Sequence, residues 1–163
     1  VCDPGEFICI GSLAVLLFVR GDIEEATRLC GAYRELLVGS TRSDLAMAIA
    51  SLDAIALCVK GRFAEALPVV EAWTKATEDL RDTWQESSGR VFRALCAAAV
   101  EPDTAVTAYV GAAMRAYRAV PHDELQTTWA IRATESLLRA RGMTSMADEL
   151  GAMLTTRQTK LAA

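Results

Sequence analysis

The sequence is poor in the residues that most chemical sites require. Its 163 residues include a single histidine, His122, and no asparagine. The five cysteines are scattered and form no Cys-x-x-Cys pair, so the chain lacks the clustered ligands of a zinc site. His122 follows a proline at an expected helix start, which is typical of a loop or cap residue, and no glycine-rich phosphate loop is present. We therefore predict no catalytic residue, no metal and no cofactor.

Basic charge and long apolar runs are also scarce. The net charge of −4 leaves no general basic field for a phosphate backbone, so we expect no direct binding of nucleic acid. The apolar run 7–19 has 13 residues, fewer than the roughly 20 needed to cross a bilayer as a helix. We expect a core helix there and no membrane partner. The cysteines fall mostly in apolar helical runs, which indicates buried thiols in a reducing, cytoplasmic setting.

What the chain does contain favours helices. It is 52% hydrophobic, with only 10 glycines and 4 prolines, and its apolar residues recur at i, i+3 and i+4 rather than in alternation. We predict one all-α domain over residues 1–163. The turn signals divide it into four helix hairpins at about 6–38, 44–80, 83–119 and 123–157.

The start of the chain adds a further expectation. Val1 stands where an initiating methionine is usual, directly before a helix that is apolar almost all round. Such a helix needs neighbours on both sides, so we expect a fragment of a longer protein, with initiation at a valine codon as the alternative.

A six-residue pattern repeats along the chain. Residues Gly21–Ala26 and Gly61–Ala66 share the form G-[D/R]-[I/F]-x-E-A, 40 residues apart, and Gly142–Ala147 echoes it 81 residues later. Each copy follows one apolar helical run and opens another. Self-similarity at a fixed period of this size is typical of stacked helical repeats.

These hexads resemble the turn and second-helix start of tetratricopeptide repeats. Counting back from the hexad alanines, that family's small first-helix residue falls on Ala14 and Ala54, and its large one on Leu17 and Leu57. The period of about 40 residues is longer than that of tetratricopeptide repeats. It is similar to the period of the helical-repeat regions of large bacterial LuxR-type and MalT-like signalling regulators. The resemblance implies a right-handed superhelix of about four antiparallel hairpins. It also implies a non-catalytic module of a bacterial transcription or signalling regulator, which binds a protein, a peptide or a small effector.

In such repeats, partners bind on the concave surface lined by the first helix of each hairpin. The resemblance places these residues on that surface: Ile8, Val15, Phe18, Val19, Ser51, Ile55, Trp129, Arg132, Ser136 and Arg139. The early part of this groove is apolar and the late part basic. The apolar part has another explanation, because a missing repeat, the chain's own end or the mate in a homodimer would cover it. The arginines have one too, a solvated face on which Glu135 pairs with Arg139.

Asp53 lies in an otherwise apolar helix, where an unpaired carboxylate would be costly. A structural interpretation pairs it with Arg90 or Arg93 of a neighbouring hairpin. A functional interpretation makes it a polar anchor in a ligand groove. Two other functions therefore stay open: a ligand-binding or catalytic helical domain built on Asp53 and nearby arginines, and a purely structural dimerisation element.

Overall fold

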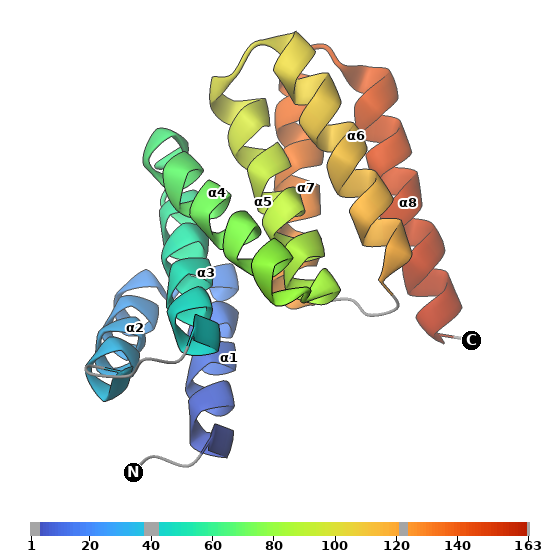
Figure 1. The fold of residues 1–163 in the computed structure, drawn as a ribbon. Helices are drawn as coiled ribbons and strands as arrows, with labels where there is room; N and C mark the ends of the chain where they lie inside the picture. The colour runs from blue at the N-terminus through green and yellow to red at the C-terminus, as the bar shows by residue number, and fades with distance from the viewer. Residues whose placement is uncertain (1–3, 38–42, 121–123, 163) are drawn as a thin grey trace.

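The computed structural model describes residues 4–37, 43–120 and 124–162, with side chains described for 10–35, 46–120 and 124–157. Nearly all of these residues lie in eight helices (Figure 1): α1 Pro4–Arg20, α2 Ile23–Leu37, α3 Ser43–Val59, α4 Phe63–Leu80, α5 Thr83–Val100, α6 Asp103–Ala119, α7 Leu125–Ala140 and α8 Thr144–Ala162. No strand occurs in these ranges, so the prediction of an all-α protein is confirmed. The helix α8 extends past residue 157, where its end was expected.

The three copies of the hexad begin with the same backbone turn. Gly21, Gly61 and Gly142 all have a positive φ, at 88°, 71° and 76°. In each turn the glycine N–H bonds to the carbonyl three residues back, and the next N–H bonds to the carbonyl five back. This double hydrogen bond satisfies the last carbonyls of the preceding helix. Arg81 makes the same turn between α4 and α5 at φ 55° without a glycine.

Most consecutive helices pack on each other: α1 on α2, α2 on α3, α3 on α4, α4 on α5, α5 on α6 and α7 on α8. Figure 1 shows α1 to α3 on one side and α6 to α8 on the other, with α4 and α5 between them. The helix α5 packs on α4, α6 and α7, and residues 91–98 within it are all buried. In addition α1 contacts both α3 and α7. The odd-numbered helices α1, α3, α5 and α7 therefore pack against one another.

Small residues allow the helices to approach closely. The hexad alanines Ala26, Ala66 and Ala147 are fully buried, as are Ala14 and Ala54 in the preceding helices. Such positions leave no room for a larger side chain without local rearrangement.

The interface between α4 and α5 is the closest of these contacts that involves a glycine. Gly89 of α5 faces Thr74 of α4, and a Cβ on Gly89 would lie 2.7 Å from the Thr74 Oγ1. Beside it Trp73 packs on Phe92, with 5.7 Å between ring centroids. Both aromatic side chains are almost fully buried, so this interface is part of the core.

Cys30, Cys58 and Cys96 are buried free thiols, as predicted for the cysteines within this part of the chain. The Sγ atoms of Cys58 and Cys96 lie 3.7 Å apart across α3 and α5. The contact with Cys96 and burial raise the pKa of Cys58, which keeps this thiol protonated. Within the described ranges, no helix has the length and hydropathy that crossing a bilayer requires.

Candidate functional site

A groove of about 490 Å³ lies where the odd-numbered helices meet. We call it the central groove. Most of its lining comes from α1, α3, α5 and the start of α7, and α2 and α4 contribute one residue each. The lining residues are Gly11, Ser12, Val15, Leu16, Tyr33, Ala48, Ser51, Leu52, Ile55, Trp73, Trp84, Gln85, Glu124, Leu125 and Gln126. Aliphatic and aromatic side chains form most of its wall. This size and composition are within the range of ligand-binding pockets.

Large apolar side chains from three helices are exposed at this groove. Leu16 of α1 is 39% exposed, Trp84 of α5 is 42% exposed and Leu125 of α7 is 47% exposed. Leu13, one turn before Leu16, is also exposed. Single exposed apolar residues are common, but their convergence on one cavity is typical of an interaction surface.

Among the residues that the structure describes, Glu124 is the only charged one that lines the central groove. The Ser88 hydroxyl donates a hydrogen bond of 2.6 Å to Glu124 Oε2, and the Thr127 hydroxyl donates one of 3.2 Å to the same oxygen. Ser88 and Thr127 are themselves buried. Burial raises the pKa of Glu124, the hydrogen bonds lower it, and the nearby negative charge of Asp82 raises it further. Among the residues with described side chains, Glu124 has no ion-pair partner within 4 Å.

Three of the residues expected in the groove line it: Val15, Ser51 and Ile55. The hydroxyl of Ser51 donates to the backbone carbonyl of Ala48 at 2.8 Å, so it is satisfied locally. Ile8 lies outside the part of the chain with described side chains.

The expectation that Phe18 lines the groove is wrong. Phe18 is 1% exposed and lies in the core. It follows the fully buried Ala14 by four residues, so the two share one face of α1, while Val15 and Leu16 occupy the adjoining face. Val19 is half-buried and does not line the groove.

The expected basic part of the groove also lies elsewhere. Trp129, Arg132, Ser136 and Arg139 do not line the cavity. Arg132 and Arg139 pair with Glu135 at 3.0 and 2.9 Å, which confirms the pairing predicted for Glu135 and Arg139.

The other two residues of that part make local contacts. The Ser136 hydroxyl donates to the carbonyl of Arg132 at 3.0 Å. Trp129 stacks on Phe92 with 6.2 Å between ring centroids. This face of α7 is therefore ion-paired at its surface and packed on α5 beneath.

Asp53 pairs with Arg34 of α2, not with Arg90 or Arg93 as expected. The reason is that α3 packs on α2 as well as on α5. The two arginines of α5 pair instead with glutamates of α4, Arg90 with Glu78 and Arg93 with Glu71. The Asp53 side chain is 31% exposed and does not line the central groove. The charge of Asp53 is therefore neutralised by Arg34 on the side of α3 that faces α2.

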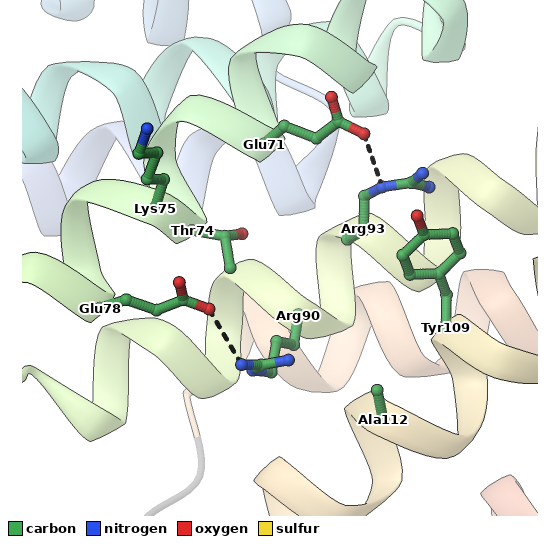
Figure 2. A pocket seen from close by; sticks show the side chains of 8 residues that line it. All are labelled: Glu71, Thr74, Lys75, Glu78, Arg90, Arg93, Tyr109 and Ala112. Atoms are coloured by element: carbon green, nitrogen blue, oxygen red, sulfur yellow. Dashed lines mark hydrogen bonds and ion pairs between the residues drawn. The ribbon is translucent and has the colours of Figure 1, made fainter.

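A second cavity, of about 320 Å³, lies between α4, α5 and α6 (Figure 2) and is lined by Glu71, Thr74, Lys75, Glu78, Arg90, Arg93, Tyr109 and Ala112. Figure 2 shows two ion pairs that cross from α4 to α5. Glu71 meets Arg93 at 3.1 Å, and Glu78 meets Arg90 at 3.0 Å.

Arg93 is the most constrained residue of this second cavity. Its side chain is 9% exposed, it also pairs with Glu101 at 2.7 Å, and its guanidinium stacks 3.6 Å above the ring of Tyr109. Its Nη1 is buried without a hydrogen-bond partner in the described part of the chain, so the ring face is its remaining favourable contact. Carboxylates of the chain itself neutralise both arginines. The ion pairs of Arg90 and Arg93 therefore join α4 to α5, and Lys75 is the lining cation without an ion pair among the residues with described side chains.

The sequence alone did not reveal the contributions of Trp84, Gln85 and the Glu124–Gln126 segment to the groove. Trp84 stands near the start of α5, in the hairpin that least resembles the other three. Glu124 precedes α7 directly, where an acidic residue is ordinarily explained by the helix dipole. The signal available in the sequence was Trp84, a large aromatic residue near the expected start of a helix.

Comparisons with protein-family models, with curated proteins and with solved structures found no match. Function is therefore inferred from the fold and from the central groove.

Proposed function

We propose that this chain is a non-catalytic helical-repeat module that binds a segment of a partner protein in the central groove. The observation that carries the proposal is the convergence of three exposed apolar side chains, Leu16, Trp84 and Leu125, on one cavity. In the wider proposal the module resembles tetratricopeptide repeats arranged as a superhelix of four hairpins, and it serves a bacterial transcription or signalling regulator.

The repeated turns support the repeat architecture. The three hexads begin with glycines of nearly the same positive φ, and the alanine that ends each hexad is fully buried. Equivalent sequence positions therefore have equivalent backbone conformation and packing in three places. This is what a repeat built from one helix-turn-helix unit requires.

The walls of the groove support binding of a protein segment. Aliphatic and aromatic side chains surround a few polar ones, so a short segment with apolar side chains could bury them there. The other function classes have less support, because Asp53 and the surface arginines are engaged in ion pairs within the chain.

A matched pair of leucine variants tests the proposal. Leu16→Glu places a charge in the central groove, whereas Leu80→Glu changes a leucine of similar exposure, 42% against 39%, that does not line it. Peptides of twelve random residues, displayed on phage, are selected on the wild-type protein, and the affinities of enriched peptides are measured by fluorescence anisotropy. Leu16→Glu should weaken binding by about tenfold or more, and Leu80→Glu should leave it unchanged.

Light scattering across a range of concentrations completes the test. A monomer that binds peptides is the expected result. If the wild-type protein is a dimer that Leu16→Glu dissociates, a second copy of the chain occupies the groove and the proposal is wrong. It is also wrong if no enriched peptide distinguishes Leu16→Glu from Leu80→Glu.

A further inference from the structure

We infer that the segment bound in the central groove carries a lysine or arginine side chain that pairs with Glu124. This inference rests on the proposed function and names the chemistry of the partner. It is argued from the position of the Glu124 carboxylate, from the charges around it and from the walls of the groove.

The structure holds the Glu124 carboxylate at the junction of α5 and α7. Two buried hydroxyls, of Ser88 on α5 and Thr127 on α7, donate to its Oε2. These contacts orient the carboxylate but are all neutral, so none of them supplies an opposite charge.

No other described residue in the lining of the groove compensates this charge. Over the described ranges 4–37, 43–120 and 124–162, the lining contains no lysine, arginine or histidine. The charged neighbour that acts on Glu124 is Asp82, which is also acidic. A carboxylate that is largely removed from water and lacks an opposite charge is unfavourable, and removing its charge or adding a cation relieves the cost. An incoming cation would therefore gain more here than at an exposed carboxylate.

The groove walls beside Glu124 are apolar, as contact with the aliphatic stem of a lysine or arginine requires. Leu125 follows Glu124 directly, and the groove also contains Leu16 and Trp84. Apolar walls can cover the aliphatic stem of lysine or arginine while its charged end reaches the carboxylate. A tryptophan ring adds a favourable surface for a cation. An acidic segment would instead be repelled by Glu124, which gives the groove a selectivity by charge.

A double-mutant cycle between peptide and protein tests the inference. In peptides enriched on the wild-type protein, one lysine or arginine at a time is replaced by norleucine, which keeps the aliphatic stem and removes the charge. On the protein side Glu124→Gln removes the charge of the carboxylate at nearly constant shape. Glu35→Gln is the control, because Glu35 is exposed on α2 and does not line the groove. Circular dichroism and thermal unfolding verify that each variant is folded.

The expected result is a strong coupling at one peptide position. Its norleucine form should bind the wild-type protein about tenfold or more weakly, and should bind Glu124→Gln as well as the charged form does. Glu35→Gln should behave like the wild-type protein. The inference is overturned if enriched peptides lack cationic residues, or if the ratio between charged and norleucine forms is the same on Glu124→Gln as on the wild type. In either case the sensitivity to Leu16→Glu would still support the proposed function, whereas loss of that sensitivity would refute both.

Discussion

Replacing Gly89 by alanine tests how closely α4 and α5 pack. The new Cβ would lie 2.7 Å from the Oγ1 of Thr74 and 3.4 Å from its Cα. The Thr74 hydroxyl cannot move freely, because it donates to the carbonyl of Val70 at 2.8 Å. Gly31 of α2 is the matched control, since a Cβ there would meet nothing within 4 Å.

Two opposing effects determine the size of the change. Alanine in place of glycine inside a helix gains about 1 kcal/mol, mainly because the unfolded chain loses conformational freedom. Forcing an extra methyl group into a packed interface costs about 1–3 kcal/mol. Gly31→Ala should therefore raise the free energy of unfolding by about 0.5–1 kcal/mol. Gly89→Ala should lower it by up to about 2 kcal/mol, so the two variants should differ by about 1–3 kcal/mol.

Urea unfolding followed by far-ultraviolet circular dichroism measures this difference, as shifts of the midpoint at constant slope. The double variant Gly89→Ala with Thr74→Ala removes the obstructing hydroxyl and should recover most of the loss. The reasoning would be refuted if Gly89→Ala stabilised the protein as much as Gly31→Ala. It would also fail if removal of the Thr74 side chain gave no recovery.

Three further predictions concern the turns and the acidic residues. Gly61→Ala should lower the free energy of unfolding by about 1–2 kcal/mol, because the residue has a φ of 71°; an unchanged melting temperature would contradict this. Because burial raises the pKa of Glu124 in the folded state, protonation stabilises the fold. The wild type should therefore lose stability relative to Glu124→Gln as the pH rises from 4.5, the ordinary value, through the folded-state pKa. Unfolding of both proteins measured over that range checks this, and a difference independent of pH would contradict it. Asp53→Asn should cost no more than about 1 kcal/mol in urea unfolding, because its ion pair with Arg34 is partly exposed; a larger loss would show that the pair is structurally essential.

The helices could be predicted from the sequence because their ends are determined locally. A glycine at Gly21, Gly61 and Gly142 allows the left-handed turn that ends a helix, and the apolar period indicates how far each helix extends. Which helix contacts which depends on crossing angles that no local pattern specifies. Asp53 illustrates this, since Arg90 or Arg93 of α5 was the expected partner and the packing of α3 on α2 gives Arg34 instead.

The central groove was predictable only in part. Val15, Ser51 and Ile55 follow from their places on α1 and α3. Phe18 was misplaced because α1 is apolar almost all round, so hydropathy does not distinguish its core face from its groove face. Glu124 could not be assigned to the groove from the sequence, because its position there depends on Ser88 and on lining residues that lie far away in the sequence.

The contact between α1 and α7 has a consequence for how the protein unfolds. In a stack whose units touch only their neighbours, the end units can detach one at a time while the rest stays folded. Here α1 ends at Arg20 and α7 begins at Leu125, yet the two helices pack on each other. Detachment of the first helices would therefore expose α7 and open the groove at the same moment. We therefore expect loss of structure in α1 to be cooperative with loss of structure in α7.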